Sequence, residues 1–483
     1  MYCVGVSAAS QPAPDFRYDG FSSDPDSGLL TCRYSLGETR FVEQVRFAPD
    51  GRWDDPAVTE AARLVFLLAG VSYYKTAAPP VIDLGDTAVT DTERDFLLSF
   101  YTDGLGEFAY RNGLDLSGLR IEGPVRPAAA ARRGTTQAPQ PAVTGEGAAT
   151  AAGGPLIPFG GGIDSIVTVE MVRRLASAGR VTGAGRAAGP ALFIMSRPGN
   201  FFAAIEKPAA VTGLPIVRAE RGIDPQLASD AASPVPIFLN GHVPVTGVLS
   251  AIAVLAAVLA GRDAVIMSNE WSASIATLEY RGRPVNHQYS KSAAFEAGFR
   301  TVLDDAFGGA MSYFSALRPR TELWVAQRFA GLTEYHSSFH SCNRAFYLDP
   351  DKRLDHWCGE CDKCCFIDLI LAPFLPAADL ERIFGGREPL RTGAGDAAIA
   401  ERFAALVGTS AASKPFECVG EVGECRAAAV LAAQRPDRAA TALLQDLAAQ
   451  LRGRPDLPAP GELLRPVGEH YIPDAYAAED LLV

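Results

Sequence analysis

The chain has 483 residues, of which 48% are hydrophobic, and its 44 basic and 56 acidic residues give a formal net charge of −12. This length and composition can bury substantial cores, so we expect an enzyme-sized globular protein of two or three domains. The acidic balance provides no global positive field to attract a phosphate backbone, which disfavours nucleic acid as a partner.

The N-terminal residues 1–122 combine a strand pattern with a helix pattern. Residues 1–16 lack a basic start and a sustained apolar run, so we expect no export signal and a cytoplasmic location. Residues 29–48 alternate between apolar and polar side chains around a glycine, which predicts antiparallel strands, and residues 56–77 have the periodicity of an amphipathic helix. We therefore predict a small α+β domain over residues 1–122.

Residues 123–154 differ in composition from everything around them. Alanine, proline, glycine and threonine displace almost all large apolar side chains in this stretch. Such a segment cannot build a core, and we predict a disordered linker.

The next region, residues 155–375, alternates strand-like and helical segments. Short apolar runs begin near residues 154, 191, 214 and 263, and segments with the pattern of helices separate them. This alternation predicts a parallel sheet wrapped by helices, and we place the catalytic domain here. The apolar stretch Val248–Gly261 is shorter than a bilayer span and rich in alanine, which indicates a buried core helix and no membrane segment.

Three consecutive glycines, Gly160, Gly161 and Gly162, stand between the first of these strands and a helix. Glycine lets the backbone approach an anion, and the helix that follows presents unpaired N–H groups and a positive dipole end. Ser165 can add a hydroxyl donor, and the carboxylate of Asp164 is explained by Mg²⁺ bridging to phosphate. The alternative, a tight strand-to-helix turn without a ligand, stays open for the glycines alone.

The order Gly160-Gly161-Gly162-Ile163-Asp164-Ser165 resembles the Ser-Gly-Gly-x-Asp-Ser loop of the PP-loop ATP pyrophosphatases. The resemblance implies cleavage of ATP between its α and β phosphates and a doubly wound parallel α/β sheet with this loop after the first strand. It also implies that the end of the next strand, with Ser196, lies near adenine. The chain departs from the family pattern at Gly160, where serine is usual, so one phosphate-binding hydroxyl is missing.

Cysteines crowd together near the end of this region, which disulfide frameworks rarely do, so the pattern favours a reducing cytosol. Three of them share x-x spacers, and a fourth lies upstream; the set is Cys342, Cys358, Cys361 and Cys364. Four thiolates that converge on a tetrahedron predict a structural Zn²⁺ site, against the alternative of redox-active or merely buried cysteines. We interpret His336, His340 and His356 as surface or packing residues. A similar arrangement occurs in deazaguanine synthase, another PP-loop protein.

Residues 376–483 are rich in alanine, leucine and arginine, which predicts a helical C-terminal region without obvious chemistry. Between the last predicted strand and the cysteines, residues 268–300 are dense in polar side chains and predict a substrate-facing loop.

The glycine loop, this polar segment and the cysteine cluster together resemble the ATP-dependent UDP-N-acetylmuramoyl-L-alanyl-L-glutamate epimerases. The resemblance implies inversion of the terminal L-glutamate of the UDP-muramoyl dipeptide for peptidoglycan synthesis, with release of AMP and diphosphate. It further implies functional coupling to a muramoyl-L-alanine:L-glutamate ligase. Two alternatives remain: an amide- or nitrile-forming enzyme like deazaguanine synthase, and a zinc-stabilised RNA-modifying module, which the acidic balance disfavours.

Inversion of an α-carbon needs two acid/base groups. His287 and Lys291 are the candidates, because histidine exchanges protons near neutrality and a partly desolvated lysine can be tuned to do so. Lys291 holding a phosphate and His287 orienting a loop are equally open interpretations. Cys365 is a lesser candidate, and Arg281 and Arg283 could bind the UDP diphosphate or could be solvated surface charges.

Overall fold

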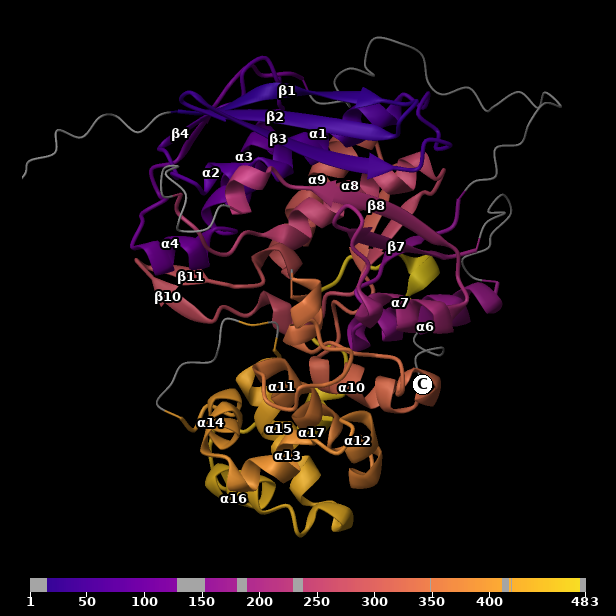
Figure 1. Cartoon of the computed structure of the whole chain (residues 1–483), viewed down its shortest axis with the longest axis vertical. Coiled ribbons are helices and arrows are strands. Elements are labelled where there is room, and N and C mark those ends of the chain that lie inside the picture. Colours follow the sequence, from indigo (N-terminus) through magenta and orange to yellow (C-terminus); the bar gives the residue numbers. More distant parts are fainter. Residues whose placement is uncertain are drawn as a thin grey trace, which may run out of the picture.

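The computed structural model describes residues 15–127, 153–179, 189–228, 238–347, 349–410, 417 and 419–477. Its centre is a ten-stranded, mostly parallel sheet with helices on both faces, and a group of helices from the C-terminal region lies at one end of the molecule (Figure 1). The strand order is β12-β9-β6-β7-β8-β3-β2-β1-β4-β5. The chain is therefore an α/β protein.

The first three strands form an antiparallel meander, as residues 29–48 predict. They are β1 (Phe16–Asp24), β2 (Leu29–Leu36) and β3 (Thr39–Phe47). Along β3, buried and exposed positions alternate, and Gly37 provides the left-handed turn with φ +57°. The predicted helix over residues 56–77 is confirmed as α1 (Ala57–Ala69) followed by α2 (Val71–Tyr74).

Two short strands extend this end of the sheet. β4 (Val81–Asp83) pairs in parallel with both β1 and β5 (Arg120–Glu122). Between them lie α3 (Asp91–Thr102), which begins with a capping box of Thr90 and Glu93, and α4 (Gly106–Asn112).

The parallel half of the sheet contains the four predicted strands and one more. They are β6 (Leu156–Pro158), β7 (Ala191–Ser196), β8 (Ile216–Gly222), β9 (Ala264–Met267) and β12 (Ser312–Ser315). Their order, β12-β9-β6-β7-β8, reverses direction at the first strand, β6. In such a sheet ligands bind outside the carboxyl ends of the strands at this reversal, here between β6 and β9.

The N-terminal meander and the parallel strands are one sheet, because β3 pairs antiparallel with β8 from Gln44–Gly222 to Phe47–Ala219. Within the predicted linker, Val125 bridges to Val89 and Arg126 forms ion pairs with Glu60 and Glu93. Residues 128–152 of the linker lie outside the described residues.

Two cores lie on opposite faces of the sheet. One contains α1, α8 (Val245–Leu259) and α9 (Ala293–Phe307), and the other contains α6 (Ile163–Ser177), α7 (Ala203–Thr212) and α10 (Glu322–Ala330). The buried α8 confirms the core helix predicted over Val248–Gly261. Among the described helices, none has the length and apolarity to span a bilayer.

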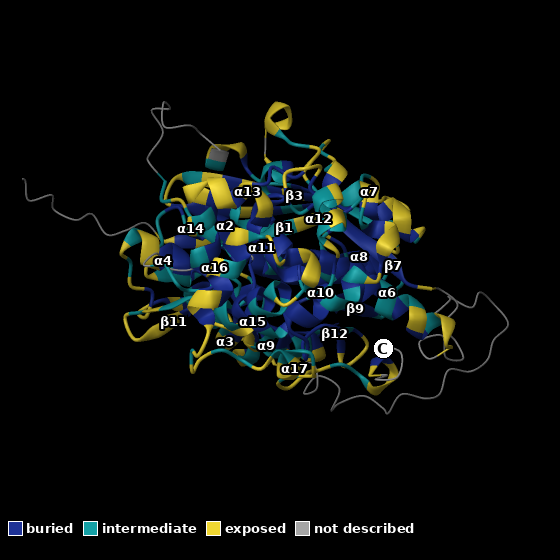
Figure 2. Cartoon of the chain, turned by 90° about the horizontal axis from the view of Figure 1, so that it is seen from below, coloured by how far each residue is buried: buried dark blue, intermediate teal, exposed yellow. Residues whose placement is uncertain are grey.

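The C-terminal region, residues 376–483, is helical, as predicted. Its helices are α12 (Ala377–Ile383), α13 (Pro389–Thr392), α14 (Ala397–Leu406), α15 (Val422–Ala433), α16 (Ala442–Leu451) and α17 (Pro460–Leu463). The buried helix α11 (Asp362–Leu371) precedes this region and packs against α10 and α15 (Figure 2). The polar segment 268–300 contains the hairpin of β10 (Leu278–Tyr280) and β11 (Arg283–Val285), flanked by the single turns η2 (Trp271–Ser274) and η3 (Tyr289–Lys291).

Candidate active site

The three glycines connect β6 to α6, but they differ in what they require. Gly161 has φ +76°, and a Cβ there would collide with the carbonyl oxygen of Ala204 at the start of α7. A Cβ at Gly160 or Gly162 would meet no neighbouring atom within 4 Å, and neither residue has a left-handed φ. Packing therefore explains why position 161 is a glycine. Gly160 and Gly162, in contrast, leave open a space that side chains would fill.

The open space lies at the N-terminus of α6. Gly162 is the N-cap and has no side chain to bond the first-turn N–H groups, and the Ser165 hydroxyl donates to the Gly162 carbonyl at 3.0 Å. A helix N-terminus without a capping side chain, at the end of a parallel strand, suits a phosphate group. The structure thus brings Gly160, Gly162, Asp164 and Ser165 together at the position that the sequence predicts for the loop.

Asp164 faces two carboxylates that the sequence did not single out, Glu270 and Glu322. One carboxylate oxygen from each of the three residues lies within 4.8 Å of those from the other two. Glu270 follows β9 and Glu322 opens α10 just after β12, so the three acids come from the carboxyl ends of β6, β9 and β12. This acidic cluster of Asp164, Glu270 and Glu322 sits at the reversal of strand order.

The acidic cluster is costly without a cation. Glu322 is only 4% exposed, and its Oε2 has no hydrogen-bond partner among the described residues. Burial, followed by the charges of Asp164 and Glu270, raises the pKa of Glu322 well above its ordinary value. Three carboxylates around one point are the oxygen ligands that Mg²⁺ accepts, and a divalent ion there would remove the repulsion.

A fourth buried acid, Glu424, reaches the cluster from the C-terminal region. It lies on α15 and accepts the Leu323 N–H at 2.9 Å, next to Glu322. Burial raises the pKa of Glu424 to about 8, and the charge of Glu270 adds to this shift. The C-terminal helices therefore contribute directly to the wall of the site.

The predicted base His287 belongs to a second cluster, together with Glu107 and His242. His287 Nδ1 hydrogen-bonds to Glu107 on α4, and the His242 and His287 ring centroids are 4.2 Å apart. Burial opposes ionisation of Glu107, but the hydrogen bond from His287 and its charge hold the pKa of Glu107 below its usual value. An ionised Glu107 fixes the His287 tautomer in which Nδ1 carries the proton.

The neighbouring histidine remains neutral. Burial, followed by the charge of His287, lowers the pKa of His242 to about 4, and the charge of Lys291 acts in the same direction. The two predicted bases, His287 and Lys291, thus lie in one neighbourhood, the end of the β10–β11 hairpin and η3.

The buried Arg318 contacts the backbone beside both clusters. Arg318 is 1% exposed; it donates to the Glu270 carbonyl at 2.9 Å and to the Lys291 carbonyl at 2.6 Å. Its Nε also pairs with Glu296 at 2.9 Å. These bonds fix the backbone at Glu270 and Lys291 relative to each other.

Three other predicted site residues, Arg281, Arg283 and Ser196, lie outside the acidic cluster and the histidine cluster. Arg281 and Arg283 are half-exposed and pair with Asp115 at 3.5 Å and Asp103 at 2.8 Å, which leaves their charges already balanced. Ser196 ends β7, beside β6 in the sheet, and borders a cavity of about 610 Å³ between β3, β8 and α8.

The four predicted zinc ligands converge. The Sγ atoms of Cys342 and Cys361 are 3.9 Å apart, those of Cys358 and Cys364 3.6 Å, and those of Cys361 and Cys364 3.5 Å. Tetrahedral Zn–S bonds of ~2.3 Å place sulfur atoms about 3.8 Å apart, so the thiols have the spacing that zinc requires. Hydrogen bonds from the other thiols, first from Cys342, lower the pKa of Cys358.

Two residues beside the predicted zinc ligands, Cys365 and Lys363, do not belong to the group of four converging thiols. Cys365 is completely buried and lies outside it, and burial raises the pKa of its thiol, which does not favour a role as a base. Between the ligands, Lys363 carries a charge that acts on Glu322. The helix α11 that begins at the cysteines thereby brings a cation toward the acidic cluster.

Sequence reasoning missed Glu107, His242, Glu270, Glu322 and Glu424. One signal pointed to Glu270, since it follows a predicted buried strand, where parallel sheets deliver polar side chains. The others come from helices and loops whose meeting depends on the joined sheet and on the packing of α15 against α10.

Two family models together match most of the chain. The MurL N-terminal domain model matches residues 8–316, and the MurL C-terminal domain model matches residues 338–459. Their junction lies between β12 and the cysteine cluster. No solved structure matches the chain.

Curated relatives agree along nearly the whole length. A UDP-N-acetyl-alpha-D-muramoyl-L-alanyl-L-glutamate epimerase of Xanthomonas oryzae pv. oryzae is 37% identical over 473 residues, which cover 95% of each chain. Proteins with the same description from Salinispora tropica and a Micromonospora species are 37% and 35% identical, and cover 85% and 96% of this chain and 82% and 96% of their own.

Proposed function

The chain belongs to the MurL family of UDP-N-acetyl-alpha-D-muramoyl-L-alanyl-L-glutamate epimerases, and from this premise we propose that it inverts the terminal glutamate of a UDP-muramoyl dipeptide through an ATP-derived acyl adenylate. It is an epimerase of peptidoglycan precursor synthesis. The observation that supports the adenylate step is the glycine loop, whose open space at the start of α6 faces the buried acidic cluster.

The substrate makes activation necessary. The nitrogen of its glutamate is an amide, so a Schiff base with a cofactor aldehyde cannot form, and the ionised carboxylate makes the neighbouring C–H a poor acid. Attack of that carboxylate on the α-phosphate of ATP expels diphosphate and gives a mixed anhydride without the negative charge. The α-proton can then be removed, because an enolate is stabilised by positioned donors. A proton returns to the opposite face, and water releases AMP and the D-product.

Each part of the loop has a role in the adenylation. The N–H groups at the start of α6 bind phosphate oxygens, and Gly160 and Gly162 leave room for them. The Ser165 hydroxyl joins them by turning its hydrogen from the Gly162 carbonyl to the phosphate. Asp164, Glu270 and Glu322 would hold Mg²⁺, which neutralises phosphate charge when bound. The placement of Ser196 near adenine belongs to the same proposal.

For proton transfer, we assign His287 as one group and Lys291 as the other. Glu107 is a positioning residue that holds His287 in one tautomer, and the neutral His242 packs against its ring. Arg318 fixes this neighbourhood relative to Glu270. The thiols of Cys342, Cys358, Cys361 and Cys364 would hold a structural zinc that stabilises the start of α11. Functional coupling to a muramoyl-L-alanine:L-glutamate ligase follows from the substrate, which such a ligase would make.

The magnesium assignment predicts opposite effects of Glu322→Gln with and without the ion. Without Mg²⁺ the variant should be more stable than the wild type by on the order of 1–3 kcal/mol, because one buried carboxylate is removed from the repulsion. With Mg²⁺ the wild type should gain stability by ligand binding and the variant should gain less. Thermal denaturation with and without the ion measures both effects.

The control is Glu279→Gln on the exposed face of β10, which makes the same change outside the acidic cluster. It should respond to Mg²⁺ as the wild type does. An equal Mg²⁺ response in Glu322→Gln and the wild type would show that the ion binds elsewhere.

The reaction itself is tested with UDP-N-acetylmuramoyl-L-Ala-L-Glu, ATP and Mg²⁺ in deuterated water. We expect the D-glutamate epimer with one deuterium at the α-carbon, together with AMP and diphosphate, since inversion through an enolate exchanges the α-proton with a group that equilibrates with solvent. Without ATP, exchange should be negligible because the carboxylate is not activated. Mass spectrometry and chiral analysis of the released glutamate give the result.

Two variants separate adenylation from inversion. His287→Gln should keep ATP–diphosphate exchange while suppressing deuterium incorporation. Lys291→Met should behave in the same way if the lysine transfers a proton, whereas loss of the exchange reaction would assign Lys291 to phosphate binding. Formation of ADP in place of AMP would exclude the adenylate, and an unchanged L-glutamate centre would exclude the epimerisation.

A further inference from the structure

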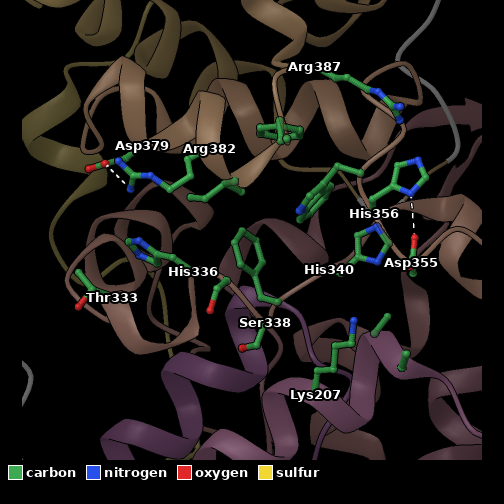
Figure 3. A pocket seen from close by; sticks show the side chains of 18 residues that line it. Lys207, Thr333, His336, Ser338, His340, Asp355, His356, Asp379, Arg382 and Arg387 are labelled. Carbon is green, nitrogen blue, oxygen red and sulfur yellow. Dashed lines mark hydrogen bonds and ion pairs between the residues drawn. The ribbon is translucent and has the colours of Figure 1, made fainter.

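A cavity of about 570 Å³ borders the first turn of α7, and neither the adenylation nor the proton transfer uses it. Its walls come from the start of α7, from the turn η4 (Thr333–Tyr335) and the residues after it, from the cysteine loop and from α12 (Figure 3). The carbonyl of Ala204, in the first turn of α7, is the group against which Gly161 packs. The first turn of α7 thus borders both this cavity and the glycine loop.

Cationic side chains line the cavity together with Asp355 and Asp379, and two of the cations form no direct ion pair. Lys207 and Arg387 form no ion pair with any residue that the structure describes, whereas Arg382 pairs with Asp379 at 2.9 Å. Figure 3 shows Lys207 extending from α7 toward His340. The first residues of α7, Ala203 and Ala204, line the cavity as well, and the N-cap Phe202 gives them no side-chain acceptor. Positive charge and uncapped N–H groups together favour an anion.

A buried group in the wall also lacks its partner. His340 lines the cavity, is 7% exposed, and its Nε2 has no hydrogen-bond partner among the described residues. A polar atom that is buried without a partner costs free energy unless a ligand supplies the missing bond. His340 therefore marks this cavity as a place where a polar ligand binds.

The same wall contains apolar surface suited to a ring. Phe339, Trp357 and Phe384 are each at least 95% buried; Trp357 packs edge to face on Phe339 with centroids 5.2 Å apart and at a tilt on Phe384 with centroids 5.0 Å apart. An anion site next to aromatic side chains matches a molecule that joins phosphate groups to a flat ring. A nucleotide has this composition, and free phosphate does not.

We propose that this cavity binds a nucleoside diphosphate, with Lys207, Arg387 and the start of α7 at the phosphates and Trp357 beside the base. Resting on the function proposed above, the nucleotide is the UDP group of the muramoyl substrate. That substrate carries its reacting glutamate and its diphosphate at opposite ends, separated by a sugar and an alanine, so the two ends need separate sites. The cavity provides the second one, and the balanced charges of Arg281 and Arg283 make them poorer candidates.

The experiment is titration of the purified full chain with UDP, followed by calorimetry and by tryptophan fluorescence, because Trp357 lines the cavity. UDP should bind the wild type, and Lys207→Met should weaken binding about tenfold or more, as expected for loss of a charge-assisted hydrogen bond. Arg387→Met should weaken it as well. Both side chains are exposed, so the variants should fold, which circular dichroism checks. The KM for the UDP-muramoyl dipeptide should rise with the dissociation constant of UDP.

The matched control is Lys352→Met, which removes an exposed lysine that pairs with Asp349 outside the cavity. It should bind UDP like the wild type. Titration with ADP distinguishes the UDP group of the substrate from the ATP cosubstrate as the occupant. Tighter binding of UDP than of ADP supports the substrate assignment. If only ADP binds, and its binding depends on Lys207, the cavity belongs to ATP and the substrate assignment is overturned. UDP binding that is absent, or equal in wild type and Lys207→Met, overturns the proposal altogether. Because UDP titration needs no turnover, its failure in an enzyme that still epimerises would leave the proposed function intact.

Discussion

Replacing Cys358 by serine should release the zinc from the chain and destabilise the C-terminal helices by on the order of 5 kcal/mol or more, because a structural zinc contributes its binding free energy to folding. We expect about one zinc per chain in the wild type. This loss of folding free energy should exceed the effect of replacing one buried thiol, because the four Sγ atoms hold the loop before α11 to the turn after Cys342. Elemental analysis and thermal denaturation measure the two quantities.

Cys365→Ser is the matched control, because this cysteine is completely buried one residue away from Cys364 but lies outside the set of four. It should keep its zinc and lose about 1 kcal/mol, a usual cost for a buried substitution. Catalysis in Cys358→Ser should fail through loss of structure, since Lys363 and α11 border the acidic cluster. Purified protein without zinc, in which all four thiols react freely, would contradict the site.

Local patterns in the sequence were sufficient wherever one segment determines its own structure. The strands β2, β3, β6, β7, β8 and β9 and the helix α8 have the periodicity or apolarity that burial requires, and the structure confirms them. The cysteine spacing likewise brings three thiols together within one turn. β12 was not predicted, because its sequence Ser-Tyr-Phe-Ser is short and begins and ends with polar residues.

Long-range pairings could not be predicted in this way. The alternating pattern of β3 indicates a strand, but nothing in it names β8 as its partner. Glu107 on α4 therefore reaches His287 across 180 residues, and Glu424 on α15 reaches Leu323 across 101. The candidate site was recognised where its residues are consecutive, as in the glycine loop, and was incomplete where they come from separate elements.

The glycine loop provides the sharpest test of ATP binding, provided that the right glycine is changed. Gly161→Val would force a collision with the Ala204 carbonyl at a left-handed φ, so its loss of activity would report a damaged fold. Gly162 has φ −84° and ψ 170°, which valine adopts readily, and a Cβ atom added there would meet no atom of the described residues within 4 Å. Valine at this position fills the open space at the start of α6 and little else changes.

Gly162→Val should therefore lower ATP–diphosphate exchange and AMP formation by at least about 100-fold, comparable to the loss of a transition-state donor in other enzymes. Its circular dichroism should stay native and its melting temperature should fall only slightly, because valine is a poorer N-cap than glycine by roughly 1 kcal/mol but breaks no contact of residue 162. Gly118→Val makes the same change at an exposed glycine with equally open surroundings and should have no effect on exchange. Gly160→Ser, which introduces the serine usual in PP-loop enzymes, should retain or increase the exchange rate. Undiminished AMP formation by folded Gly162→Val would mean that the phosphates do not bind at this helix start, and the loop would then be only a strand-to-helix turn.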